Sequence, residues 1–127
     1  MRKKETEKSL QVAIMTALGF RGWRCIKMPP SIYTSGKGIP DLLCMRDGIT
    51  AWIEVKTEKG RLSPQQQRFG QMVDDAGGLY IVARSVDFAV RTLETVRISF
   101  FDKNGNQTLT VSPARGMRLT VSEKDIR

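Results

Sequence analysis

Two apolar segments separated by a tight turn constrain the fold of this chain more than any other feature of its sequence. Residues 42–45 and 49–56 have the composition of strands, and the Asp47-Gly48 pair between them is a strong signal for a hairpin turn. Because side chains alternate along a strand, Glu54 and Lys56 are expected on the same face of the second strand. The sequence therefore predicts an antiparallel hairpin that carries an acid and a base side by side near its end.

Helical and strand patterns on both sides of the hairpin predict the rest of the fold. Ser63, Pro64 and Gln66 form a capping-box pattern with proline at the first helical position. The remaining elements are predicted, in chain order, at residues 5–18 (helix), 23–28 (strand), 63–76 (helix), 79–83 (strand) and 85–94 (helix). This order, helix, three strands, helix, strand, helix, indicates a mixed α/β sandwich and not a repeating βαβ array.

The C-terminal region has a weaker pattern. Apolar and polar residues alternate over residues 96–100, and a turn signal at Asn104-Gly105 precedes residues 108–111, so an extra β-hairpin is expected there. A length of 127 residues with no low-complexity linker fits one domain. We therefore expect a single domain over residues 1–127, with a core at about 5–93 and a C-terminal extension at about 95–127.

The chain is strongly basic. Its 21 Lys and Arg outnumber its 13 Asp and Glu, and the net charge of +8 favours nucleic acid as a partner, although charge alone fits solubility equally well. The absence of histidine excludes a Ser/His/Asp triad, a histidine general base and histidine metal ligands. Any hydrolytic chemistry must therefore use carboxylates, lysine and a metal ion.

The cysteines and the N-terminus both indicate an intracellular protein. Cys25 and Cys44 stand 19 positions apart without a CxxC pair, so both thiols are expected to be reduced and packed. No apolar stretch approaches the roughly 20 residues that cross a bilayer. Basic residues 1–4 are followed by acids instead of the apolar segment of a secretory signal, so we expect no membrane association.

Three residues at the open end of the hairpin carry the candidate chemistry. Asp41 precedes the first strand, Glu54 lies near the end of the second, and twelve residues separate the two acids, so their carboxylates can converge on one cation. Mg²⁺ suits such a site because it prefers oxygen ligands and keeps several waters. A bound cation would assist phosphodiester hydrolysis, and the Lys56 ammonium would either orient the attacking water or stabilise the charge on the phosphate.

The motif and its flanking sequence resemble a known family. Pro40 with Asp41, followed by Glu54, Val55 and Lys56, matches the PD-(D/E)xK nuclease signature. Together with Glu7, the segment 36–38, and residues 60–64 followed by Gln66, it resembles a VRR-NUC domain over roughly residues 5–93. The resemblance implies a restriction-endonuclease-like core, dependence on Mg²⁺ or Mn²⁺, and nuclease activity often directed at branched DNA.

The resemblance also implies roles for single residues. Asp41 and Glu54 would be metal ligands, Val55 a ligand through its carbonyl, Lys56 the catalytic lysine, Glu7 an outer acid and Gln66 an amide lining the site. Two of these roles have alternatives. Glu7 can instead be a first-turn acid that complements the helix dipole, with Glu5 competing for its role, and Gln66 can serve only the helix cap. Phosphate contacts are proposed for four basic residues, each of which can equally be a solvated charge: Lys37, Lys59, Arg61 and Arg68.

Three functions remain open from the sequence. The first is a Mg²⁺-dependent DNA endonuclease that selects branched DNA such as Holliday junctions, acting in recombination and repair. The second is a sequence-specific restriction-type endonuclease, whose recognition element would be the loop 31–38 or the C-terminal hairpin. The third is a non-catalytic nucleic-acid-binding module. Stand-alone members of the family resemble phage proteins and dimeric junction resolvases, so a homodimer or higher homo-oligomer is expected in the cytoplasm of a bacterial or phage-infected host cell.

Overall fold

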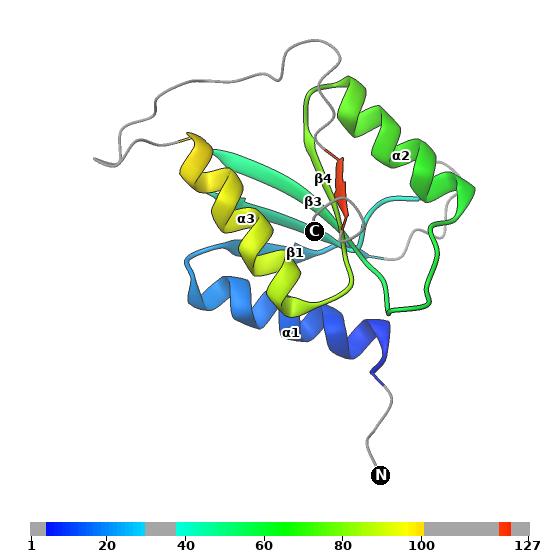
Figure 1. The fold of residues 1–127 in the computed structure, drawn as a ribbon, viewed down its shortest axis with the longest axis horizontal. Coiled ribbons are helices and arrows are strands. Elements are labelled where there is room, and N and C mark those ends of the chain that lie inside the picture. The colour runs from blue at the N-terminus through cyan, green and yellow to red at the C-terminus, as the bar shows by residue number, and fades with distance from the viewer. Residues whose placement is uncertain (1–4, 30–37, 101–119, 123–127) are drawn as a thin grey trace.

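The chain folds into a mixed α/β structure in the order predicted from its sequence (Figure 1). The computed structural model describes residues 5–29, 38–100 and 120–122. Its elements are α1 (Glu7–Phe20), β1 (Arg24–Lys27), β2 (Leu42–Arg46), β3 (Ile49–Val55), α2 (Pro64–Asp75), β4 (Leu79–Ala83), α3 (Val86–Phe100) and β5 (Thr120–Ser122). The predicted order of helix, three strands, helix, strand, helix is confirmed, and β5 adds a strand that the sequence did not indicate.

The sheet has the order β1-β2-β3-β4-β5, antiparallel from β1 to β3 and parallel from β3 to β5. The parallel pairing of β3 with β4 follows from the helix α2 that crosses between them. In the hairpin, Leu42 pairs with Ile53. Asp41 comes one residue before that pair and Glu54 one residue after it, so the register brings the two acids to the same end of the sheet.

Helices cover both faces of the sheet and define two hydrophobic clusters (Figure 1). On one face, α1 and α3 pack against the sheet through residues such as Ile14, Ile53 and Leu93, which are fully buried. On the other face, α2 packs through a smaller cluster that includes Val73 and Tyr80. Strand β3 contributes to both clusters because its side chains alternate between the two faces.

The N-terminal caps of α1 and α2 are both capping boxes. Thr6 and Ser9 form the cap of α1, and Ser63 and Gln66 form the predicted cap of α2, with Pro64 at the first helical position. Each cap satisfies backbone N–H groups that the first helical turn leaves without a partner. The caps therefore fix where both helices begin, next to the end of the sheet that carries the acids.

Two glycines allow close contacts around α2. A Cβ on Gly70 would lie 2.6 Å from Tyr80 Cε1, so only glycine lets α2 approach β4 this closely. Gly38 has a φ of +90°, and a Cβ there would lie 2.4 Å from the Gln65 carbonyl oxygen. The segment that leads to Asp41 is therefore held against α2 by a backbone contact that no larger residue would allow.

The prediction of a strand at residues 96–100 was wrong. Helix α3 continues to Phe100, and Val96 packs against the main hydrophobic cluster one turn after the buried Thr92 and Leu93. The alternation over five residues was too short to distinguish a strand from a helix, and no glycine or proline stops the helix earlier. The rest of the expected hairpin, at residues 104–111, lies outside the described residues. No helix in the described ranges is long and apolar enough to cross a membrane.

Candidate active site

Asp41 and Glu54 lie next to each other at the end of the hairpin. The Asp41 Oδ2 atom accepts a hydrogen bond of 2.8 Å from the backbone N–H of Val55, the residue that follows Glu54. This bond ties the start of β2 to the end of β3 through a side chain instead of the backbone. The structure therefore places the two carboxylates as the hairpin register predicts.

Glu54 is an acid in an almost fully buried position. The residue is 1% exposed, and its Oε1 atom accepts a hydrogen bond of 2.7 Å from Gln66 Nε2. Its Oε2 atom is also buried and has no hydrogen-bond partner among the described residues. Burial, with the negative charge of Asp41 adding to it and Lys56 opposing it, raises the pKa of Glu54 to about 8.

Lys56 bridges two acids that come from different elements. Its Nζ atom lies 3.6 Å from Glu54 Oε1 and 3.8 Å from Glu7 Oε1, and the residue is only 8% exposed. Glu7 reaches this position from the first turn of α1, whereas Glu5 is exposed ahead of the helix. Of the two acids that competed for this place in the sequence, the structure brings Glu7 to the lysine.

Gln66 makes two contacts at once, and they correspond to its two alternative roles. Its Oε1 atom accepts the Ser63 N–H at 2.8 Å, which completes the α2 cap, while its Nε2 atom donates to Glu54. The cap fixes which end of the amide is the acceptor, so the NH₂ group must face the acid. The helix cap therefore orients the side chain that holds Glu54.

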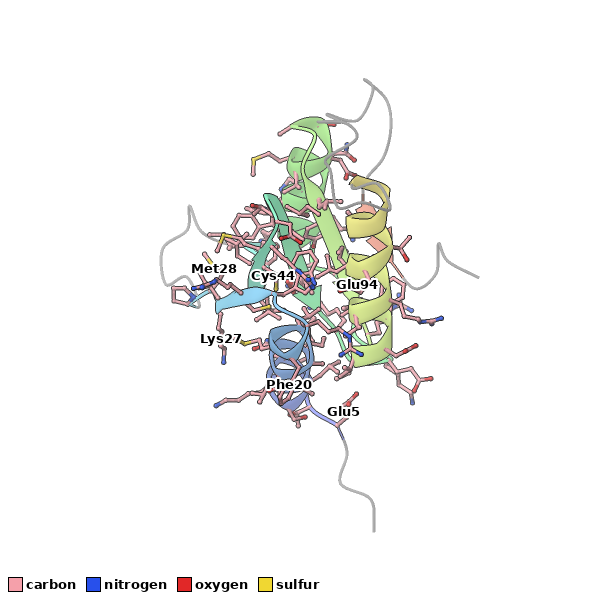
Figure 2. All side chains as sticks on the ribbon, turned by 90° about the vertical axis from the view of Figure 1, so that its left-hand side faces the viewer. Glu5, Phe20, Lys27, Met28, Cys44 and Glu94 are labelled. Atoms are coloured by element: carbon pink, nitrogen blue, oxygen red, sulfur yellow. The ribbon has the colours of Figure 1, made fainter. Side chains whose placement is uncertain are left out.

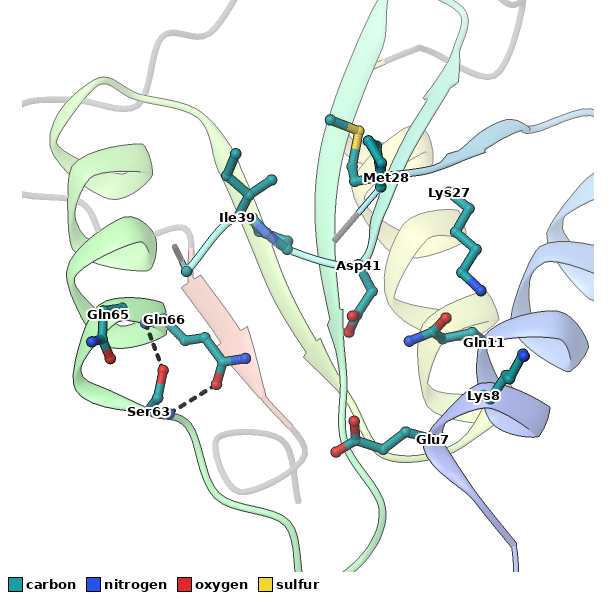
Figure 3. Close-up of a pocket in the computed structure, with 13 residues that line it drawn as sticks. Glu7, Lys8, Gln11, Lys27, Met28, Ile39, Asp41, Ser63, Gln65 and Gln66 are labelled. Atoms are coloured by element: carbon teal, nitrogen blue, oxygen red, sulfur yellow. Dashed lines mark hydrogen bonds between the residues drawn. The ribbon is translucent and has the colours of Figure 1, made fainter. Parts of the chain in front are cut away.

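A cleft of about 660 Å³ opens above these residues, between the first turns of α1 and α2 (Figure 3). Of the candidate residues, Glu7, Asp41 and Gln66 line it, whereas Glu54 and Lys56 are buried. Its wall includes four polar residues that the sequence analysis did not select: Lys8, Gln11, Lys27 and Gln65. A sequence signal existed for one of them, since Gln11 follows Glu7 by one helical turn and shares its side of α1.

The predicted phosphate contacts lie away from the cleft wall. Lys59, Arg61 and Arg68 are exposed, and none of them is among the residues that line the cleft. Lys59 and Arg61 belong to the segment between β3 and α2, and Arg68 lies on α2. Lys37 lies outside the described residues. The geometry neither joins these side chains to the acids nor gives them a partner within the described part of the chain.

The donor set fits a hard divalent cation. Within the described ranges no group of three or more His, Cys, Asp or Glu is placed to hold a metal ion. Asp41 and Glu54, with a backbone carbonyl and water, offer the oxygen ligands that such a cation takes. Glu54 Oε2 is a buried oxygen without a hydrogen-bond donor, beside a second carboxylate. A cation at this point would supply the missing partner and offset the repulsion between the two acids.

A PD-(D/E)xK nuclease has this architecture: a sheet with α-helices on both faces, and two acids and a lysine at the end of its central hairpin. The model of the VRR-NUC domain family matches residues 4–87, and the chain belongs to this family. A solved VRR-NUC domain is similar in fold, with a TM-score of 0.60 and 24% sequence identity over 69% of this chain and 94% of the other. No curated protein sequence matches the chain.

The family assignment gives the class of chemistry. VRR-NUC domains are nuclease domains, so the chain has a nuclease-type function with DNA as its substrate. Nucleases of the PD-(D/E)xK type generally use divalent metals, in agreement with the donor set described above. The matched residues contain all five candidate catalytic residues, and the match ends at the start of α3.

Proposed function

We propose that this protein is a metal-dependent DNA endonuclease that hydrolyses phosphodiester bonds in the cleft between α1 and α2. The observation that carries the proposal is the pair formed by Asp41 and Glu54, in which a buried acid with a partnerless oxygen faces a second acid. Holding two carboxylates together in a buried position is costly without a cation. A domain that only bound DNA would gain nothing from this arrangement, because phosphate is itself negative.

The metal ligands in this proposal are the carboxylates of Asp41 and Glu54 and the carbonyl of Val55. When bound, Mg²⁺ or Mn²⁺ supplies a Lewis acid and lowers the pKa of a coordinated water. Gln66 keeps Glu54 in place by donating to one of its oxygens, which leaves the other oxygen free to face the cation. The Asp41 carboxylate is oriented by the Val55 N–H in the same way.

Lys56 is the catalytic lysine of the proposal. Its ammonium lies between Glu54 and Glu7, so two carboxylates restrict its direction. From there it orients the attacking water or stabilises the additional charge on the phosphate during the reaction. Glu7, which is partly exposed at the cleft wall, acts through Lys56 by holding the ammonium.

The substrate of the proposal is branched DNA, such as a Holliday junction. A small domain without an evident base-reading module selects its substrate through shape and phosphate contacts instead of base contacts. Two cleft lysines, Lys8 and Lys27, lie on the wall opposite α2 and can contact phosphates next to the cleaved bond. A symmetrical junction calls for a homodimer, which is the oligomeric state that we propose.

Cleavage assays with matched variants test the proposal. Labelled four-way junction, flap, single-stranded and linear duplex DNA are incubated with Mg²⁺, Mn²⁺ or EDTA. We expect metal-dependent cleavage that Asp41→Ala abolishes, whereas Asp87→Ala, which removes an exposed acid paired with Arg91 on α3, retains it. Binding without cleavage under every metal condition would instead identify a non-catalytic binding module, and cleavage confined to one duplex sequence would identify a restriction-type enzyme.

A further inference from the structure

Arg84 makes three hydrogen bonds with one short segment of backbone. This residue directly follows β4, and its Nη1 atom donates to the carbonyl oxygens of Thr57 at 2.7 Å, Glu58 at 3.3 Å and Gly60 at 2.7 Å. Nη1 has only two N–H groups, so one of them is shared between acceptors. The three carbonyls converge on this guanidinium from a distance of 24 to 27 residues along the chain.

The segment that Arg84 holds, residues 57–60, is the turn that follows the catalytic lysine of the proposed function. We call it the β3–α2 turn. It begins directly after Lys56, closes through a hydrogen bond of 3.0 Å from the Gly60 N–H to the Thr57 carbonyl, and leads to the Ser63 cap of α2. The Lys56 backbone is tied to the same part of β4, because its N–H donates to the carbonyl of Ala83.

Gly60 is the point at which this turn packs against the side chains of the site. A Cβ on Gly60 would lie 3.3 Å from Lys56 Cδ and 3.5 Å from Glu7 Oε1, so the turn lies directly on the aliphatic part of the lysine. This contact helps to keep Lys56 only 8% exposed, with its ammonium between Glu54 and Glu7. A shift of the turn would therefore release the lysine side chain.

We propose that Arg84 is a positioning residue for catalysis, which fixes the β3–α2 turn and through it the direction of the Lys56 ammonium. This inference rests on the proposed nuclease function for its catalytic consequence, but not for the contact itself. The guanidinium suits the task because it offers a rigid set of donors to fixed carbonyls. No carboxylate among the described residues lies within ion-pair distance of it, so its acceptors are these neutral carbonyls.

Two substitutions of Arg84 separate positioning from other roles. Arg84→Met keeps an aliphatic chain and removes every donor, whereas Arg84→Lys keeps a charge and three donors that can reach carbonyl oxygens. With a four-way junction substrate and saturating Mg²⁺, we expect Arg84→Met to lower kcat roughly 10- to 100-fold with little change in KM, because a small misplacement of a catalytic group has an effect of that size. Arg84→Lys should restore most of kcat.

A matched variant controls for general loss of stability. Ile49→Val removes one methylene from a buried residue at the start of β3, whereas Arg84 follows the residue of β4 that pairs with the last residue of β3. All variants are assayed at a temperature where thermal denaturation shows them to be folded. An equal loss of kcat in Ile49→Val and Arg84→Met would overturn the proposal, and so would a rise in KM with unchanged kcat, which would mark Arg84 as a phosphate contact.

Hydrogen exchange tests the contact without DNA or cleavage. In the wild type we expect the Gly60 amide, which donates to Thr57, to be protected, and Arg84→Met should lose that protection while Arg84→Lys keeps it. Unchanged exchange at residues 57–60 in Arg84→Met overturns the proposal whatever the activity. A wild type that cleaves no DNA with any metal defeats the proposed function instead, and the contact of Arg84 with the β3–α2 turn is then judged by exchange alone.

Discussion

The two faces of strand β3 are built for different purposes, although they alternate residue by residue. Ile53 and Val55 point to the α1 and α3 face, where they are fully buried in the main hydrophobic cluster. Glu54 and Lys56 alternate with them and carry charges that are almost as deeply buried. At the end of the strand, one face thus stabilises the fold by apolar packing, while the other holds charged groups in place at a cost in desolvation.

This contrast explains why the charged end of the sheet is so heavily supported. Residues 54–60 make hydrogen bonds or ion pairs with four other parts of the chain, through Asp41, Gln66, Glu7 and Arg84. Nothing of this kind surrounds Ile53, because apolar packing is not directional. Substitutions on the two faces should therefore separate loss of stability from loss of activity.

The largest effect on stability is expected from the apolar face. Ile53→Ala removes a fully buried side chain between the sheet and its helices and should lower the free energy of unfolding by about 2–5 kcal/mol. Cleavage per folded molecule should stay close to that of the wild type. Urea denaturation, followed by cleavage assays at a temperature where the variant is folded, measures both quantities. A variant that is stable but inactive would contradict the division between the faces.

The charged face should make the stability of the fold depend on pH. The folded-state pKa of Glu54, raised to about 8, exceeds its usual value, so between the two values the folded protein binds a proton that the unfolded chain releases. Without metal, the free energy of unfolding should therefore fall as pH rises from about 5 to about 8 and level off above that, with a slope of at most about 1.4 kcal/mol per pH unit from this group. Thermal denaturation in EDTA across this range measures the slope.

Glu54→Gln isolates the source of that slope. The amide has the shape of the protonated acid, so this variant should lose most of the pH dependence and be at least as stable as the wild type above pH 8, while losing cleavage. Asp87→Asn, at an exposed acid on α3, should keep the wild-type slope. Added Mg²⁺ should flatten the slope of the wild type and of Asp87→Asn, and leave Glu54→Gln unchanged. A slope that survives in Glu54→Gln would assign the effect to another group.

The charged face also shows how far the sequence alone could lead. Asp41, Glu54 and Lys56 could be predicted to converge because hairpin register and strand alternation depend on residues close in the chain. The Gln66 cap was predictable for the same reason. The support from Arg84 was not, because a charged residue after a strand gives no signal that backbone carbonyls 24 residues or more away will surround it.

The two cysteines are a second example of a contact between distant residues that the sequence does not predict. They stand 19 positions apart in the sequence, yet they face each other across β1 and β2, and the Cys44 thiol donates a hydrogen bond of 2.7 Å to Cys25 Sγ. Both are free, and Cys44 lies in the interior (Figure 2). Their proximity depends on the pairing of β1 with β2, which involves a strand outside the predicted hairpin. The register of that pair could not be inferred without the structure.

The smallest effect, a change in DNA affinity, is expected from substitutions in the basic wall of the cleft. These substitutions distinguish charges that contact DNA from charges, such as Lys56, that are part of the buried site. Lys27 lines the cleft at the end of β1, and Arg24 lies exposed at the other end of the same strand. If Lys27 contacts one phosphate, Lys27→Gln should weaken DNA binding and reduce the slope of log affinity against log salt by about 0.9. Arg24→Gln removes the same charge and should leave this slope unchanged.

Binding is best measured with a junction in EDTA, so that cleavage does not interfere, over a series of salt concentrations. Lys56→Gln provides the second comparison, because the Lys56 ammonium is held by Glu54 and Glu7 and the residue is only 8% exposed. It should abolish cleavage with little change in the salt slope, the reverse of Lys27→Gln. Equal slopes for Lys27→Gln and Arg24→Gln would mean that the cleft wall attracts DNA only through net charge, and that other residues contact the DNA phosphates.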